Sequence, residues 1–297
     1  MIKKFAQLTL SGRLPAFAVV FGFLALALVF PLASIVSGAV LVCVTLQAGL
    51  RNGAMLVAMA ALALAIVCYV FVGNPVIGLY AAIAQLVPCL LLAAIFRNTR
   101  SLDITLQAAA LIGALAFIVI DMALPANALF WQQVLKQILE PIFLAANMPQ
   151  VDVESNIATV SEYMTGIMIV SIVLVHSSLI FLGYWLNCVA HDCKQYKEDF
   201  KNIRLGKVLA LLAIGLASAA VVLQSSYLAQ LSGILTILFC IPGMSFIHTL
   251  CDSMTNSKLW LIISYLLIVF VPQAIVIIIL LGLFETFFGL RNKINRY

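Results

Sequence analysis

The sequence predicts an all-α fold, a polytopic transmembrane helix bundle. Of its 297 residues, 65% are hydrophobic and only 9% are charged, whereas soluble chains have roughly 45–50% apolar and about 25% charged residues. The apolar residues form long blocks, several near the roughly 20 residues that cross a hydrocarbon core. Blocks such as Ala54–Val72 lack the alternating polarity of membrane β-strands. Because backbone groups in lipid must pair within their own segment, each block is expected to be a helix.

Short connections divide the chain into apolar segments that would pack as antiparallel neighbours in a single integral membrane domain over residues 1–297. In chain order these segments are Leu14–Phe30, Leu32–Leu50, Ala54–Val72, Val76–Phe96, Ile104–Ala123, Tyr163–Trp185, Val208–Leu223, Ile234–Leu250 and Leu259–Phe284. An odd number of crossings would place the basic C-terminus outside. We therefore expect about eight spans, with Ile234–Leu250 re-entrant or Leu259–Phe284 turning back at Pro272.

Basic residues set the expected orientation, because short cytosolic loops carry an excess of Lys and Arg. Eight of them are expected at the cytosolic membrane surface: Arg13, Arg51, Arg97, Arg100, Lys194, Lys197, Lys201 and Arg204. Lys3 and Lys4 precede them, and Arg291, Lys293 and Arg296 follow them. The sequence thus predicts a bacterial cytoplasmic (inner) membrane protein with both termini in the cytosol.

Residues 125–162 form the one long loop expected outside the membrane. Within it, Ala126–Asn147 has apolar residues at helical spacing and polar residues between them, which indicates an amphipathic helix in the outer interface. Trp131 would lie at headgroup level, and Pro141 would kink or end the helix. The helix would serve as an interfacial brace or as a lid over an outward-facing cavity.

Residues 189–207 are expected to form a basic cytosolic juxtamembrane helix. The stretch His191–Lys207 contains five Lys and Arg residues and three acidic ones. Such a helix would lie against anionic membrane lipid, or it would dock a protein partner such as an energising ATPase. We expect no nucleic acid to bind to so few charges.

Ionisable and polar residues within apolar segments are the candidates for a ligand or proton site, because such groups are costly in a bilayer. His176 lies near the middle of a span, Asp121 lies near the outer end of another, and Gln85 belongs to a third. The structural alternative is that His176 hydrogen-bonds a neighbouring helix and that Asp121 reaches the interface. Glu285 and Arg291 are expected at the interface.

Cys188-x-x-His191-Asp192-Cys193 has the composition of a metal-ligand cluster. On a helix, however, Cys193 would point away from Cys188 and His191, and no second ligand pair follows, so no metal is expected. No cysteine falls in the external loop, so no disulfide framework is expected either. Since the chain carries no phosphate loop, zincin motif or nucleophile elbow, we expect neither a cofactor nor an enzyme activity.

Several junctions together resemble the YybS-like family of bacterial multi-pass membrane proteins, a family with a domain of unknown function. They are Ser11–Ala16, Leu46–Gly53, Gly73–Pro75, Arg97–Ser101 and Leu281–Arg291. The ending departs from the family pattern, which favours Asp at the position of Glu285 and another acid at Gly289. The family pattern is distantly similar to the S components of energy-coupling-factor transporters and to the rod-shape protein MreD.

The resemblance implies two classes of function. The first is a small-molecule binding or transport subunit that holds a polar ligand near Gln85, Asp121 and His176 and depends on an energising partner. The second is a non-catalytic membrane scaffold or assembly partner, which would dock through small-residue faces such as Ala61-x-x-x-Ala65.

Overall fold

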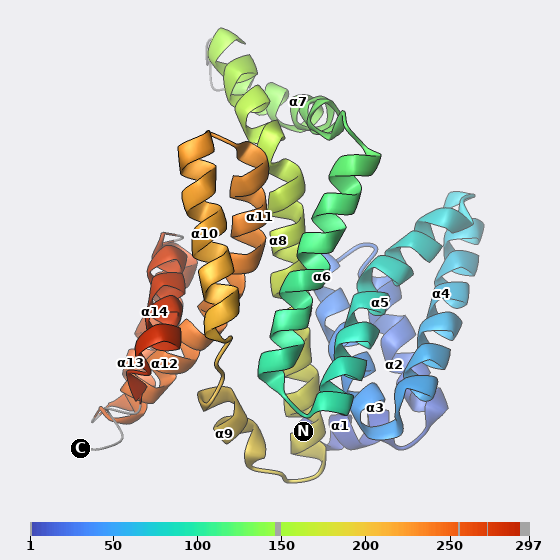
Figure 1. The fold of residues 1–297 in the computed structure, drawn as a ribbon. Helices are drawn as coiled ribbons and strands as arrows, with labels where there is room; N and C mark the ends of the chain where they lie inside the picture. The colour runs from blue at the N-terminus through green and yellow to red at the C-terminus, as the bar shows by residue number, and fades with distance from the viewer. Residues whose placement is uncertain (1, 146–149, 255, 272, 292–297) are drawn as a thin grey trace. The chain divides into compact units, whose positions relative to one another are not determined.

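A computed structural model describes residues 2–145, 150–254, 256–271 and 273–291, and every regular element within these ranges is helical (Figure 1). The all-α prediction is therefore confirmed. Pro272, Lys293 and Arg296, for which the sequence made specific predictions, lie outside the described residues.

Fourteen α-helices and two short 3₁₀ turns make up the described part of the chain. They are α1 (Ile2–Leu10), α2 (Arg13–Leu26), η1 (Pro31–Ala33), α3 (Ser34–Ala48), α4 (Leu50–Val72), α5 (Pro75–Thr99), α6 (Leu102–Ala123), α7 (Asn127–Ala145), α8 (Gln150–Ala190), α9 (Gln195–Lys201), α10 (Lys207–Leu223), α11 (Ser226–Thr236), η2 (Ile237–Phe239), α12 (Cys240–Asp252), α13 (Ser257–Phe270) and α14 (Ala274–Phe288).

The chain is a multi-pass membrane protein with fewer full-length spans than predicted. In the described residues, six helical segments are long and apolar enough to cross a membrane, or seven if the bent pair α1 and α2 forms one span. The predicted span Leu259–Phe284 is divided between α13 and α14, which have 14 and 15 residues. At 1.5 Å per residue each is about 20 Å long, which is short of a hydrocarbon core about 30 Å thick.

The chain forms two compact units. The first comprises residues 1–108 and 175–203, and the second comprises residues 109–174 and 204–297. Helices α6 and α8 contribute residues to both units. The single membrane domain expected over residues 1–297 stays a prediction.

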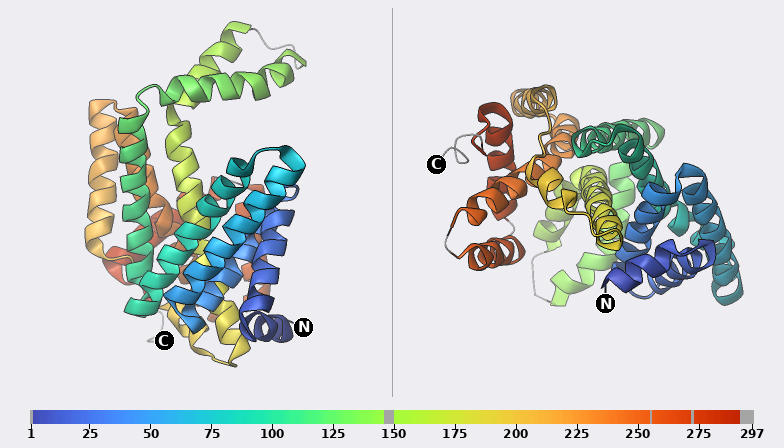
Figure 2. Two further views of the ribbon diagram at one scale, coloured as in Figure 1. Left: turned by 90° about the vertical axis from the view of Figure 1, so that its right-hand side faces the viewer. Right: turned by 90° about the horizontal axis from the view of Figure 1, so that it is seen from below.

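Small residues bring the helices of the first unit close together, and Figure 2 shows α2 to α5 side by side. A Cβ atom added to Gly78 of α5 would lie 2.4 Å from the Leu64 carbonyl oxygen of α4. One added to Gly183 of α8 would lie 2.5 Å from the Val42 side chain of α3. Backbones can approach this closely only where a side chain is absent, which is how helices in lipid gain their packing contacts.

An additional short helix at the N-terminus was not anticipated from the sequence. Helix α1 is bent by 116° from α2 and buries Ala6 on one face. Its Gln7 side chain donates a hydrogen bond to the carbonyl oxygen of Ala190 (3.4 Å), and Lys3 pairs with Asp192. These contacts fasten α1 to the C-terminal end of α8, where backbone carbonyls lack helical partners.

Helix α7 confirms that the amphipathic stretch is helical, although Pro141 lies within the helix and does not end it. The Trp131 indole nitrogen donates to the Thr165 hydroxyl of α8 (2.9 Å), and Leu135 packs against Val153 and Ile157. The predicted loop 125–162 is also shorter than expected, because α8 begins at Gln150. With 41 residues, α8 is about 60 Å long, roughly twice the hydrocarbon thickness.

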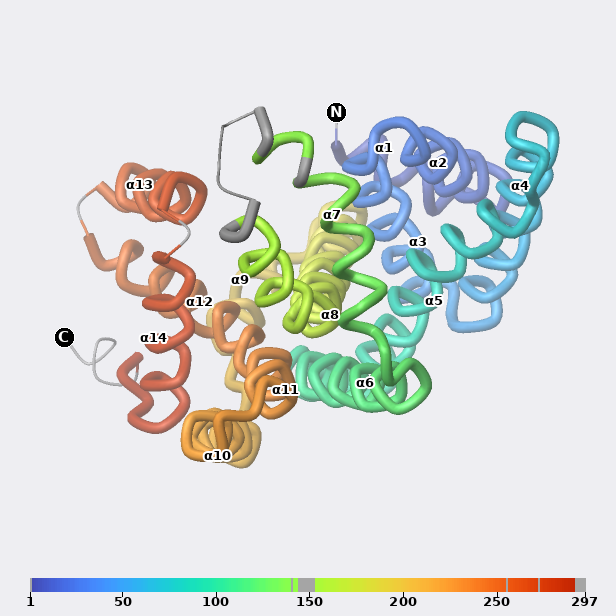
Figure 3. Tube along the Cα trace, turned by 90° about the horizontal axis from the view of Figure 1, so that it is seen from above, coloured from blue at the N-terminus to red at the C-terminus, as the bar shows by residue number. Residues whose placement is uncertain are grey.

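Two glycines bring α12 and α14 of the second unit into backbone contact (Figure 3). A Cβ atom added to Gly243 of α12 would lie 2.0 Å from the Ile278 carbonyl oxygen of α14. One added to Gly282 of α14 would lie 1.9 Å from the carbonyl oxygen of Phe239, directly before α12. Neither position can accept a side chain without separating the two segments.

The expectation that Glu285 and Arg291 lie at an interface is wrong, because both are buried, with exposures of 2% and 4%. Gly289 turns the chain back with φ of 56°, so that Arg291 can reach the preceding turn of α14. The Arg291 Nε atom lies 3.2 Å from Glu285 Oε1, in ion-pair contact without hydrogen-bond geometry. Its guanidinium also donates to the Pro242 carbonyl oxygen of α12 (3.0 Å). The pair thus joins α12 to α14.

Replacing Gly282 by Ala should destabilise the protein, because the new methyl group overlaps the Phe239 carbonyl. The expected cost is about 1–3 kcal/mol, measured as a lower melting temperature in detergent. Gly215→Ala in α10 is the matched control, since nothing lies within 4 Å of an added Cβ there; it should be neutral or stabilise by roughly 0.5–1 kcal/mol. Equal melting temperatures for the two variants would contradict the close approach of α12 and α14.

Replacing Glu285 by Gln should leave the Arg291 charge buried without its counter-ion, at a cost of about 3–5 kcal/mol. Thermal unfolding of the double variant with Arg291→Met should recover much of that loss. Asp192→Asn, which breaks the exposed pair with Lys3, is the control and should cost less than about 1 kcal/mol. A Glu285→Gln variant as stable as this control would show that the pair is not buried.

Candidate ligand-binding site

Two of the three residues predicted for a ligand site lie together in the first unit. The His176 Nε2 atom lies 3.2 Å from the Gln85 carbonyl oxygen, and the Gln85 amide donates to the Ser34 carbonyl oxygen (3.2 Å). The histidine contact falls in the turn of α5 that precedes Pro88, which lacks the N–H that would bond the Ala84 carbonyl. His176 is 5% exposed. Its geometry is that of a polar bond between helices.

Asp121 belongs to the second unit, near the C-terminal end of α6. One of its carboxylate oxygens accepts a hydrogen bond from the Asn127 side chain at the start of α7 (3.0 Å). Asp121 therefore fixes the turn between α6 and α7. No contact of the described residues assigns it to a site with Gln85 and His176.

The segment after α8 differs from the expected continuous helix over residues 189–207. Cys188 and Cys193 form a disulfide, contrary to the expectation of free thiols, because the chain turns back at Asp192 with φ of 57°. The following helix, α9, has only seven residues. Among the described residues no group of three His, Cys, Asp or Glu side chains is arranged to hold a metal ion.

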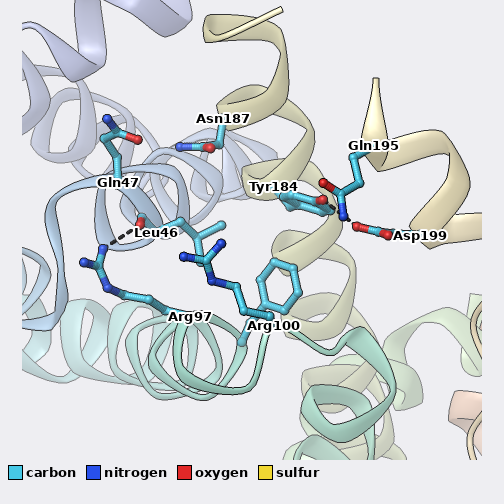
Figure 4. A pocket seen from close by; sticks show the side chains of 9 residues that line it. Leu46, Gln47, Arg97, Arg100, Tyr184, Asn187, Gln195 and Asp199 are labelled. Atoms are coloured by element: carbon cyan, nitrogen blue, oxygen red, sulfur yellow. Dashed lines mark hydrogen bonds between the residues drawn. The ribbon is translucent and has the colours of Figure 1, made fainter. Parts of the chain in front are cut away.

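A polar cavity of about 330 Å³ lies within the first unit, where the ends of α3, α5 and α8 meet α9 (Figure 4). We call it the Arg100 cavity. It is lined by Leu46, Gln47, Phe96, Arg97, Arg100, Tyr184, Asn187, Gln195 and Asp199. The sequence predicts a role for only two of these residues, Arg97 and Arg100, as basic groups at the membrane surface.

Arg97 is the structural arginine of the cavity wall. Its guanidinium donates to the carbonyl oxygens of Thr45 (3.1 Å) and Leu46 (2.5 Å), in the last turn of α3. These carbonyls form the negative end of the helix dipole, which a cation stabilises. The guanidinium of Arg97 therefore stabilises the C-terminal end of α3. The helix ends at Gly49, which has φ of 94°.

Arg100 is held differently. It ends α5 in the left-handed conformation, with φ of 54°, and its backbone N–H donates to the Phe96 carbonyl oxygen (2.8 Å). This turn directs the exposed side chain into the cavity, where its guanidinium lies beside Leu46 (Figure 4). Its guanidinium makes no hydrogen bond or ion pair with any side chain or carbonyl in the described ranges. Arg100 is thus a cation with unused donors.

The opposite wall comes from α8 and α9. The Tyr184 hydroxyl donates to Asp199 Oδ2 (2.6 Å), and the Tyr184 ring packs against Tyr196 with the ring centroids 5.5 Å apart. These contacts fix α9 against the end of α8. The Asn187 side chain lies beside the Cys43 thiol, whose sulfur is a weak acceptor, and its buried Nδ2 makes no hydrogen bond of normal geometry with the described residues.

One sequence signal could have indicated this wall. Tyr184 and Asn187 are three residues apart and so share one face near the end of an apolar helix. Polar side chains in that position, preceding a charged segment, suggest a hydrated recess. The aromatic contacts that bring Asp199 into the site depend on the turn at Asp192, which the sequence pattern did not indicate.

Comparison of the chain with protein-family models, with curated proteins and with solved structures finds no match.

His176→Ala should lower the stability of the first unit by about 1 kcal/mol, the usual net contribution of a buried hydrogen bond. It should leave the amount of any small molecule that co-purifies with the protein unchanged. Thermal unfolding and native mass spectrometry in detergent measure the two effects, with His191→Ala, at an exposed position, as the control. If a stable His176→Ala variant lost its bound ligand, His176 would belong to the ligand site after all.

Proposed function

We propose that this protein is a non-catalytic subunit that binds a small polar ligand in the Arg100 cavity. The observation that carries the proposal is the pair of unused donors in one recess, the exposed Arg100 guanidinium and the buried Asn187 amide. A buried donor without an acceptor costs about 1–3 kcal/mol, and a bound ligand would remove that cost. The volume of about 330 Å³ also lies at the lower end of the range for small-molecule sites, about 300–1,000 Å³.

The cellular setting belongs to the same proposal. The excess of basic residues in the short connections supports a bacterial cytoplasmic membrane with the Arg100 cavity at its cytosolic side. Transport would require a separate energising partner. The resemblance to YybS-like proteins, and through them to transporter S components, supports such a role. The binding site would lie at the cytosolic ends of the helices and not, as the sequence predicted, at His176.

Native mass spectrometry of the protein released from mild detergent tests the proposal. The wild-type protein should carry a bound small molecule or lipid, and Arg100→Gln should reduce its occupancy by about tenfold or more, since a charge-assisted hydrogen bond contributes about 1.5–3 kcal/mol.

The matched control is Arg51→Gln, because Arg51 is also an exposed arginine at a helix end but does not line the cavity. Its occupancy should equal that of the wild type. Arg100→Lys keeps the charge and should retain part of the binding. Identical bound species in wild type, Arg100→Gln and Arg51→Gln would contradict the proposed function.

A further inference from the structure

The Arg100 cavity contains opposite charges that do not pair with each other. Arg100 and Asp199 both line it, yet no ion pair joins them, and the only hydrogen bond of the Asp199 carboxylate within the described residues comes from Tyr184. Figure 4 shows the Arg100 and Asp199 side chains on different walls of the cavity. Two opposite charges in one recess normally attract each other, so their separation leaves each one able to bind a ligand group.

This arrangement disfavours a ligand with a single charge. The hydrogen-bond donors of Arg97 are used by the carbonyls of α3, so Arg100 and Asp199 are the two charged residues of the wall that can bind a ligand directly. A ligand anion attracted by Arg100 would be repelled by Asp199, and a ligand cation attracted by Asp199 would be repelled by Arg100. A molecule that carries both charges would satisfy both residues.

The neutral side chains fit the same kind of ligand. The Tyr184 hydroxyl donates a hydrogen bond to Asp199, which leaves the lone pairs of its oxygen able to accept a hydrogen bond from an ammonium group. The unpartnered Asn187 amide points toward Gln47 in Figure 4 and can donate to an oxyanion. Gln47 and Gln195 carry both a donor and an acceptor.

We infer that the ligand is a small zwitterion, whose phosphate or carboxylate binds Arg100 and Asn187 and whose ammonium group binds Asp199 and Tyr184. The inference rests on the proposed function and names the ligand class of that same cavity. A phosphoethanolamine group has this chemistry. It could come from the headgroup of a membrane phospholipid, because basic recesses between membrane helices bind headgroups, or from a soluble metabolite.

Calorimetric titration of the full-length protein in an uncharged detergent tests the inference with three probes. Phosphoethanolamine carries both charges, ethyl phosphate lacks the ammonium group, and ethanolamine lacks the phosphate. Phosphoethanolamine should bind at least about tenfold more tightly than either of the others, which corresponds to about 1.4 kcal/mol.

Two variants assign the ends of the ligand. Asp199→Asn keeps an acceptor for Tyr184 and should abolish the preference over ethyl phosphate. Arg100→Gln should abolish the preference over ethanolamine, while Arg100→Lys should restore part of it and so exclude misfolding as the cause. Arg51→Gln should behave as the wild type.

Native mass spectrometry from nanodiscs that contain phosphatidylethanolamine then separates the two sources. If the protein retains phosphatidylethanolamine and added phosphoethanolamine displaces it, the natural ligand is the lipid headgroup. If phosphoethanolamine binds while the lipid stays bound, the natural ligand is a soluble metabolite.

The inference fails if ethyl phosphate binds as tightly as phosphoethanolamine and Asp199→Asn strengthens both. The cavity would then be a simple anion site, and the proposed function would stand. The inference also fails if none of the probes binds while the wild type retains a ligand of another class that depends on Arg100. If neither probe nor native ligand depends on Arg100, the inference and the proposed function both fail.

Discussion

The hydrocarbon core offers no water to a polar group, and this constraint organises the first unit. A polar group left without a partner in lipid costs several kcal/mol, so polar side chains among its apolar helices bind backbone carbonyls at several positions. Gln85 binds the Ser34 carbonyl and Arg97 binds that of Leu46. Such bonds join segments about 50 residues apart in the chain. The buried Asn187 amide departs from this rule, and it lines the same cavity as the exposed Arg100.

The second unit meets the same constraint with charge and close packing. Gly243 and Gly282 bring α12 and α14 to backbone contact, and the buried pair of Glu285 and Arg291 closes one end of that contact. Each residue of the pair would be costly alone in a low-dielectric interior. Their opposite charges compensate each other, and Arg291 also donates to the Pro242 carbonyl, so these ionisable groups serve the packing of the unit.

The sequence was sufficient for features that depend on a single helix, and insufficient for features that depend on a turn. Apolar blocks identified the membrane class and most helices, and the periodicity around Trp131 identified α7. The break between α13 and α14 lowers the span count, and the sequence offered it as one of two alternatives without a signal that chose between them. Burial of Arg291 requires the left-handed turn at Gly289, and the position of Asp199 requires the turn at Asp192. Hydropathy patterns carry no information about such turns.

The central claim is that the Arg100 cavity is a ligand site with two separated charges. An experimental structure of the protein in lipid nanodiscs, at a resolution that shows side chains and bound molecules, tests it most directly. The account predicts density for a small molecule or headgroup between Arg100 and Asp199, with the Tyr184 hydroxyl still bound to the carboxylate. A direct ion pair between Arg100 and Asp199 that closes an empty recess would contradict it.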